Sequence, residues 1–129
     1  MSKHITLGGD MKLPDGTVIP LSKAIRAGDF IFSSGQLGIN EEFLLSDGIK
    51  NQTAQCISNI ENILSSEGFS LSNVIKNTVW LTSLENFAEF NKAYAKRFSN
   101  NPPARSTVCS ELAIKGALVE IEAIAFCPL

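Results

Sequence analysis

The segment 118–126 places two carboxylates where they could act on a bound molecule. Side chains alternate along a strand, so the segment has two faces, Val119, Ile121, Ala123 and Ala125 on one and Leu118, Glu120, Glu122, Ile124 and Phe126 on the other. The first face is wholly apolar, whereas the second mixes large apolar side chains with Glu120 and Glu122. Such a face predicts a subunit interface with a polar pocket cut into it. The alternative is a half-exposed edge strand whose two acids are simply solvated.

Metal-dependent and nucleophilic chemistry find little support in the sequence. The single histidine, His4, lies in a segment that we expect to fray, and Cys56, Cys109 and Cys127 have no zinc-site spacing. A Cys–His catalytic pair would require His4 to fold back onto a cysteine. No glycine-rich phosphate-binding loop is present either. We therefore expect no metal and no organic cofactor.

Composition narrows the class of protein. With 129 residues, 44% hydrophobic and 19% charged, the chain is expected to form one globular domain, residues 1–129. A net charge of −2 without a Lys/Arg cluster argues against nucleic acid as a partner, and no apolar run approaches the roughly 20 residues that span a membrane. The N-terminus lacks the apolar core of a signal peptide, and three irregularly spaced cysteines indicate free thiols. We expect a cytoplasmic protein.

Turn signals and periodicity predict the first elements. Pro14-Asp15-Gly16 and Ala27-Gly28-Asp29 break the first forty residues into strands, the second turn joining 23–26 to 30–32 in a hairpin that ends at 33–36. Apolar side chains then recur at three- and four-residue spacing and predict a helix over 50–66, with Gly68 at its C-terminal cap.

The second half predicts a strand over 74–81 and a helix starting near Asn86, with Asn86 as N-cap and Glu89 completing a capping box. Aromatic residues line one face of this helix, at positions 87, 90, 94 and 98. Strands over 105–111 and 118–126 follow. Two helices among five or six strands predict an α+β fold with both helices on one face of the sheet.

Four segments, in order and with matching spacing, resemble the RidA/YjgF family along nearly the whole chain. They are residues 27–36, residues 77–82 with 87–91, Pro103-Ala104-Arg105-Ser106-Thr107, and residues 116–125. The resemblance implies a chorismate-mutase-like α+β domain, mostly antiparallel, and a homotrimer with active sites in clefts between subunits. It also implies hydrolysis of reactive 2-imino acids, formed from enamines that amino-acid dehydratases release, to 2-oxo acids and ammonia.

The resemblance also suggests roles for individual residues. Arg105 is the candidate to bind the substrate carboxylate, because its planar fork can grip two oxygens at once. The alternative is a structural ion pair with Glu120 or Glu122. Glu120 is the candidate to polarise the attacking water or to pass a proton to the departing amine, and the alternative is a surface charge. Glu122 is expected to be structural or to support the catalytic residue without touching the substrate.

Further positions match pocket-lining segments of the family, each with packing or capping as the alternative: Ser34, Gly35, Phe87, Asn91 and Thr107. One position departs from the pattern. Deaminases of the family that act on small imino acids usually have Pro-Tyr-Ser before the hairpin, whereas this chain has Pro20-Leu21-Ser22. Leu21 cannot form the hydrogen bond of a tyrosine hydroxyl, which places the usual substrate in doubt. Alternatively, Leu21 packs in the trimer interface.

Two other functions compete with the deaminase. The first is a non-catalytic, metabolite-binding or regulatory trimer that uses the same cleft. The second is a ribonuclease or translation inhibitor, activities attached to some relatives. The acidic pI, about 5.4, and the missing basic patch argue against the second.

Overall fold

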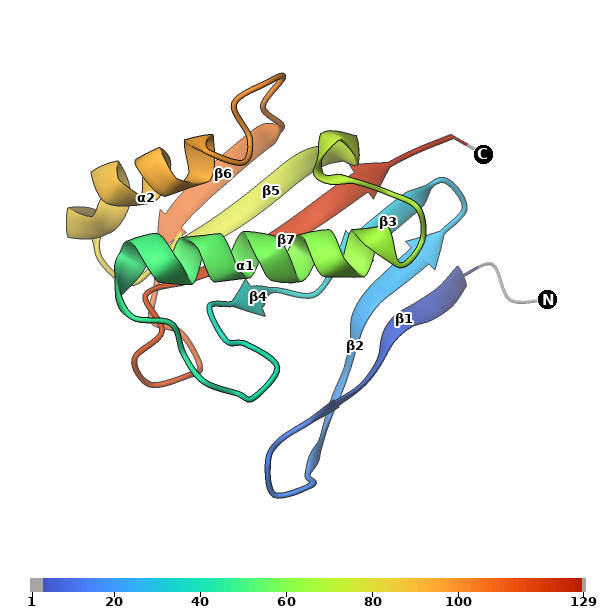
Figure 1. The fold of residues 1–129 in the computed structure, drawn as a ribbon, viewed down its shortest axis with the longest axis horizontal. Helices are drawn as coiled ribbons and strands as arrows, with labels where there is room; N and C mark the ends of the chain where they lie inside the picture. The colour runs from blue at the N-terminus through green and yellow to red at the C-terminus, as the bar shows by residue number, and fades with distance from the viewer. Residues whose placement is uncertain (1–3, 129) are drawn as a thin grey trace.

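The protein, here as a computed structural model describing residues 4–128, forms one seven-stranded sheet with two helices (Figure 1). Met1, Ser2 and Lys3 belong to the segment considered above for a signal peptide and lie outside the described residues. The elements, in chain order, are β1 (His4–Lys12), β2 (Val18–Ala27), β3 (Phe30–Ser33), β4 (Gln36–Leu37), α1 (Gly48–Ser65), β5 (Val74–Leu81), α2 (Phe87–Ala95), β6 (Ala104–Cys109) and β7 (Val119–Phe126). Short 3-10 turns precede β5 (Leu71–Asn73) and α2 (Leu84–Asn86).

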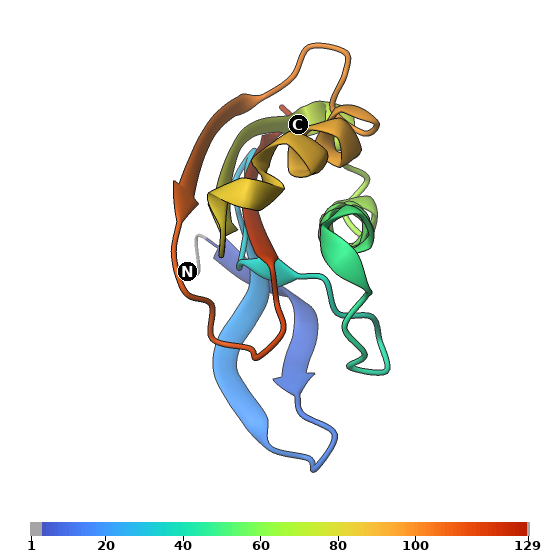
Figure 2. The same ribbon diagram turned by 90° about the vertical axis from the view of Figure 1, so that its left-hand side faces the viewer.

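Both helices cover the same face of the sheet, as the sequence predicted, and Figure 2 shows them on one side of the curved strands. The core lies between these layers, where the Val119, Ile121, Ala123 and Ala125 face of β7 is buried against the helices. The opposite sheet face, which we call the open face, has no helix over it within residues 4–128. Several large side chains lie on it, namely Phe30, Phe32, Trp80, Ile124 and Phe126.

The last strand lies inside the sheet. The order is β1-β2-β3-β7-β5-β6, with β4 also paired to β7, so β7 has neighbours on both sides. The alternative of a half-exposed edge strand is therefore wrong. All pairings among these strands are antiparallel except that of β5 with β6, because α2 carries the chain back to the starting end of β5.

Most predicted elements are confirmed. The strand over 74–81 is β5, the helix over 50–66 is α1 to within two residues, and the hairpin turns at 27–29 between β2 and β3. Gly68, with φ of 76°, follows the end of α1, and the Phe69 N–H donates to the Leu64 carbonyl oxygen. Within residues 4–128, no helix has the length and apolar character needed to cross a membrane.

Two local predictions are wrong. His4 was expected to fray, but it begins β1 and pairs with Ala27. Asn86 precedes α2 without capping it by its side chain. The Ser83 hydroxyl oxygen instead accepts a hydrogen bond from the Glu85 N–H, at the start of the 3-10 turn that leads into the helix. The side-chain cap is therefore made by Ser83, at the start of the 3-10 turn, and not by Asn86 at the start of α2.

Candidate functional site

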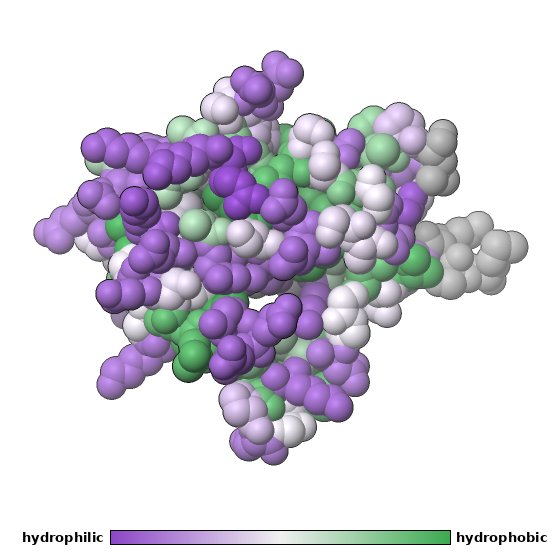
Figure 3. All heavy atoms as spheres, viewed as in Figure 1, coloured by the Kyte–Doolittle hydropathy of each residue, from purple (hydrophilic) through white to green (hydrophobic). Residues whose placement is uncertain are grey.

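Three predicted substrate-binding residues line one hollow beside the β1–β2 hairpin, which we call the hairpin hollow. It has a volume of about 370 Å³ and lies between that hairpin, β4 and α1, where Figure 3 shows an opening below α1. Its walls include Leu21, Ser34, Gly35, Asn59, Asn62 and Ile63. Leu21 is 44% exposed there. The Ser34 hydroxyl donates to the Ser22 carbonyl oxygen at 2.5 Å, so it is already engaged within the chain.

Glu120 lies on the open face, directly beside Gly35. A Cβ built at Gly35 would overlap the Glu120 carboxylate, so only glycine permits this close approach. Burial raises the pKa of the Glu120 carboxyl, and the negative charge of Glu122 on the same face raises it further. Within residues 4–128, the Glu120 carboxylate has no ion-pair partner. A partly buried carboxylate whose pKa is raised takes up a proton more readily than an exposed one, which suits it to proton transfer.

The position of Glu120 is fixed from the other side of the sheet. The Gln52 side chain on α1 donates to the Gly116 carbonyl oxygen at 3.1 Å and accepts from the Leu118 N–H at 2.8 Å. These two bonds hold the chain entering β7. A Cβ at Gly38 would collide with the Gln52 backbone, so α1 packs closely on this end of the sheet. The helix thus sets the register at which Glu120 meets Gly35.

Arg105 is held by aromatic rings on α2. Its Cζ lies 4.8 Å from the ring centroid of Tyr94, 5.4 Å from that of Phe90 and 5.9 Å from that of Phe87. We call this arrangement the Arg105 cradle. Rings attract a guanidinium through their negative faces without occupying its N–H groups. Within the described part of the chain, Arg105 forms neither an ion pair nor a hydrogen bond through its side chain.

Other predicted residues fall at or near the cradle. Thr107 follows Arg105 on the same face of β6, and its buried hydroxyl has no hydrogen-bond partner in residues 4–128. Phe87 is a member of the cradle. Asn91, one turn further along α2, is partly exposed, and its side chain has no hydrogen-bond partner among residues 4–128.

The two candidate catalytic residues lie on opposite faces of the sheet. Arg105 pairs with Asn77, which faces the helices, whereas Glu120 pairs with Trp80 on the open face. Residues paired across a ladder share a face, and neighbours along a strand alternate. The alternative of an Arg105 ion pair with Glu120 or Glu122 is therefore not what the chain forms. A molecule small enough to be a metabolite cannot touch both residues of one copy.

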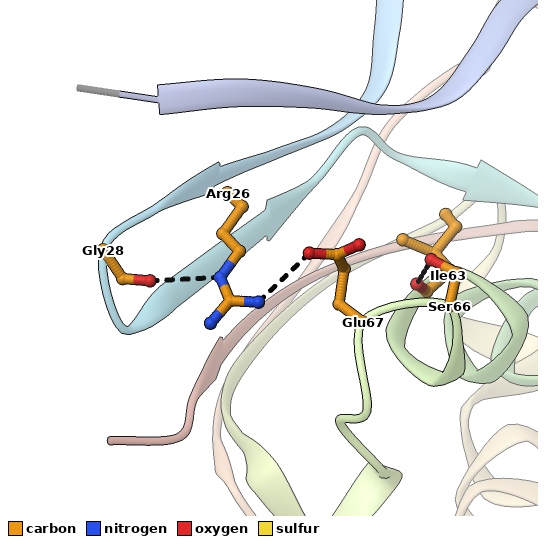
Figure 4. A network of polar contacts seen from close by, with 5 residues as sticks. All are labelled: Arg26, Gly28, Ile63, Ser66 and Glu67. Atoms are coloured by element: carbon orange, nitrogen blue, oxygen red, sulfur yellow. Dashed lines mark hydrogen bonds and ion pairs between the residues drawn. The ribbon is translucent and has the colours of Figure 1, made fainter. Parts of the chain in front are cut away.

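A second arginine, Arg26, uses its guanidinium to join two elements of the fold. Arg26 on β2 donates from Nη1 to Glu67 Oε1 at 3.0 Å and from Nε to the Gly28 carbonyl oxygen at 3.2 Å (Figure 4). Its Cζ also lies 5.2 Å from the ring centroid of Phe69. This network ties the β2–β3 hairpin to the end of α1. Among residues 4–128, no group of three or more His, Cys, Asp or Glu side chains is arranged to hold a metal ion.

Comparison with known proteins gives the family. A family model described as endoribonuclease L-PSP matches residues 15–127. A RutC family protein of Pyrococcus horikoshii is 43% identical over 109 residues, which are 83% of this chain and 86% of that protein. Reactive Intermediate Deaminase A of Arabidopsis thaliana, described as chloroplastic, is 39% identical over 108 residues, 82% of this chain and 58% of that protein. The chain belongs to the RidA (YjgF) family.

The fold is that of the RidA family as well. The crystal structure of RidA from an Antarctic Psychrobacter species superposes with a TM-score of 0.85 at 35% identity, covering 95% of this chain and 99% of that one. The YjgF gene product of E. coli superposes with a TM-score of 0.78 at 30% identity, covering 83% and 87%. The predicted fold class, two helices on a mostly antiparallel sheet, is thereby confirmed.

Sequence reasoning missed three residues at this RidA-like site. Phe90 and Tyr94 were placed on an apolar stripe of the second helix without a link to Arg105, and Asn77 was read only as part of a strand. The signal was present, because aromatic residues at positions 87, 90 and 94 face one direction on a helix. The missing information was that β6 lies under that stripe with Arg105 turned toward it.

Proposed function

We propose that the protein hydrolyses reactive 2-imino acids, which arise from enamines released by amino-acid dehydratases, to 2-oxo acids and ammonia. The observation that carries the proposal is the unpaired guanidinium of Arg105, which three rings hold in place while its N–H groups stay available for a carboxylate. A relative 39% identical is named Reactive Intermediate Deaminase A. Its name supports the same reaction class for this chain.

In the proposed reaction, Arg105 binds the substrate carboxylate through two parallel N–H···O bonds and so orients the imine carbon. The imine is protonated, which makes its carbon electrophilic. The Glu120 carboxylate takes a proton from water as the water oxygen bonds to that carbon. Glu120 then passes the proton to the nitrogen. As the C–N bond breaks and ammonia leaves, Glu120 takes the hydroxyl proton and the C=O bond forms; Glu120 then releases this proton to the solvent, which supplied the one that protonated the imine. One water is consumed, and no electrons are transferred to or from another molecule.

We also propose that the site forms between copies of the chain, in a homotrimer. Because Arg105 and Glu120 lie on opposite faces, a second copy supplies the missing partner. Apolar side chains exposed on the open face support association there, among them Phe30, Phe32 and Phe126, which are 37 to 43% exposed. Soluble monomers rarely leave such aromatic clusters in water. Sedimentation of a stable monomer at micromolar concentration would contradict this arrangement.

A complementation experiment tests the shared site directly. Glu120→Gln and Arg105→Lys chains, each carrying a different affinity tag, are co-expressed, and mixed assemblies are isolated through both tags. If each site joins two copies, about a third of the interfaces in these mixed trimers combine an intact Arg105 with an intact Glu120 and recover activity. If both residues act within one copy, the mixed assemblies stay as inactive as the parents.

The activity itself is tested by generating imines in situ with an amino-acid oxidase or a dehydratase. We expect the protein to accelerate the formation of 2-oxo acid and ammonia, and the Arg105→Lys variant to do so far less. Binding of a 2-oxo acid without any acceleration would instead indicate the non-catalytic metabolite-binding function.

We propose the cytoplasm as the location. Cys56, Cys109 and Cys127 are free thiols, as expected in a reducing compartment. Relatives include proteins described as mitochondrial and chloroplastic. A fluorescent fusion compared with organelle markers tests the proposal, and a signal confined to an organelle would overturn it.

A further inference from the structure

A buried amide lies beneath the Arg105 cradle, at a position where the strand is otherwise apolar. Asn77 is 0% exposed, and Val79 and Leu81, the next residues on the same face of β5, are apolar and also fully buried. Its Nδ2 donates to the Tyr94 hydroxyl at 2.8 Å, and its Oδ1 has no partner within residues 4–128. Burying a half-satisfied amide is costly. An apolar residue of similar size would fill the position at lower cost, so packing does not explain Asn77.

Tyr94, the partner of this amide, is the ring closest to Arg105. Its centroid lies 4.8 Å from Arg105 Cζ. Phe90 and Phe98 flank the ring at centroid distances of 5.4 and 4.8 Å, and the side chain is 6% exposed. Burial raises the pKa of the Tyr94 hydroxyl, which therefore stays neutral as a partner for the amide. The ring is thus confined by two aromatic neighbours, and its hydroxyl end is tied to β5.

The same amide sits beside Arg105 in the sheet, because Asn77 and Arg105 are paired residues of β5 and β6. We propose that Asn77 is a positioning residue for Arg105, acting through Tyr94, an inference that rests on the proposed function. Asn77 cannot touch substrate, since it is fully buried. By fixing the tilt of the Tyr94 ring, it fixes the plane in which the guanidinium presents its N–H groups. A planar fork binds both carboxylate oxygens only when its plane matches theirs.

The kinetic consequence is specific. Arg105 grips the carboxylate before and during the reaction, so disordering the guanidinium weakens ground state and transition state alike. Loss of such uniform binding raises KM and leaves kcat nearly unchanged. The Asn77→Leu and Tyr94→Phe substitutions should each raise KM about fivefold, as expected for one neutral hydrogen bond. Because both remove the same bond, the double variant should be no worse than the more affected single variant.

Thr53→Val serves as the matched control. Thr53 is also 0% exposed with an unpartnered hydroxyl in the described chain, but it lies on α1. It should change stability without raising KM. In an Arg105→Lys background, Asn77→Leu should have no further effect on KM, because the planar group that Tyr94 orients is gone. Tyr94→Phe keeps the ring and its packing, so it tests the idea even if Asn77→Leu folds poorly.

A second readout needs no activity. The Nε–Hε NMR signal of Arg105 should be displaced by ring currents in the unaltered protein. It should move toward the position of a solvent-exposed arginine in Asn77→Leu and Tyr94→Phe, but not in Thr53→Val. If the protein hydrolyses no imine while this signal behaves as expected, the proposed function fails and the positioning stands. If the protein is active but KM and the Arg105 signal change no more than in Thr53→Val, the positioning role is overturned.

Discussion

Arg26 and Arg105 are both stacked on aromatic rings, yet they are prepared for different tasks. The Arg26 guanidinium donates hydrogen bonds to the Glu67 carboxylate and to the Gly28 carbonyl oxygen, and it also lies over the Phe69 ring. Arg105 has three rings, and within the described chain no anion reaches it. Stacking orients a guanidinium while leaving its hydrogen-bonding edge unused. An ion pair consumes that edge. The difference separates an arginine that joins two elements from one that can receive a ligand.

Glu120 resembles Arg105 rather than Arg26, because it is also a charged side chain without an ionic partner among residues 4–128. Substituting it should have the largest effect on activity. The Glu120→Gln substitution keeps the shape of the side chain but removes its ability to accept a proton. We expect turnover to fall by about 10²- to 10⁴-fold while a 2-oxo acid still binds. Steady-state kinetics together with calorimetric titration would measure both quantities. Normal turnover would shift the catalytic role to Glu122 or to a water held by the backbone.

Arg105→Lys should have the next largest effect. Lysine retains the charge but not the planar fork, and charged hydrogen bonds contribute about 1.5–3 kcal/mol each, so kcat/KM should fall roughly 10- to 150-fold. The thermal unfolding midpoint should change little, since Arg105 makes no ion pair within residues 4–128. A Lys variant with full activity would place Arg105 with Arg26, among the structural arginines.

Leu21→Tyr should change substrate preference by a smaller factor. If Leu21 faces the ligand from the hairpin hollow, it favours apolar side chains by about 0.8 kcal/mol for each methylene buried against it. Imines of leucine or methionine should then be processed better, relative to the alanine-derived imine, than by the Tyr variant. The ratio of kcat/KM values in both proteins measures this. An unchanged ratio with altered assembly would instead place Leu21 in the subunit interface.

Arg26→Met should have the opposite profile to Arg105→Lys. It removes a partly buried ion pair and a hydrogen bond to a carbonyl, so we expect a loss of about 1–2 kcal/mol in unfolding free energy. Activity should stay within a factor of two or so, because Arg26 lies at the hairpin–helix junction. Urea titration measures the stability change, and a Glu67→Gln cycle isolates the ionic part. A large loss of activity without loss of stability would undo the contrast between the two arginines.

The smallest expected effect is a dependence of stability on pH. Burial raises the pKa of Glu120 above its ordinary value, about 4.5, so the folded chain holds this proton more tightly than the unfolded chain. Ionised Glu120 therefore destabilises the fold once the pH exceeds the raised value, and the penalty is absent below the ordinary one. Glu120→Gln should therefore unfold at a higher temperature than the unaltered protein at neutral pH. The two midpoints should converge at about pH 4.

Melting curves at several pH values measure this effect. Glu85→Gln, at an exposed acid on the turn before α2, is the control. A gap between Glu120→Gln and the unaltered protein that is equal at acid and neutral pH would contradict the effect of burial on Glu120.

Local patterns predicted the elements well but not their neighbours. The β-branched run of β5 and the apolar stripe of α1 could be recognised in the sequence, because the spacing of apolar residues that defines each element lies within one continuous segment. β1 was harder, since Gly8 and Gly9 have φ of 86° and 68° and the pairing with β2 is irregular there. Nothing in the β6 segment indicates that it pairs in parallel with β5, because strand partners depend on the path of α2.

The sequence suggests which residue types form the candidate site, but it does not give their geometry. Side-chain alternation shows which residues share a face within one strand. It does not relate Arg105 on β6 to Glu120 on β7, because the loop between the two strands breaks the alternation. Their separation onto opposite faces is therefore visible only in three dimensions. The same holds for Gly35, whose close approach to Glu120 comes from two strands far apart in sequence.

The position of β7 also determines when this protein can fold. β7 is synthesised after every other strand described, yet it lies between β3 and β5 and holds the two halves of the sheet together (Figure 1). Until it is available, β1–β3 and β5–β6 share no strand pairing, and the apolar faces of both helices lack the middle of their sheet. Long-range pairing of this kind makes folding slow relative to helix formation. A nascent chain thus has to remain incomplete, with exposed apolar surface, until its last strand has been synthesised.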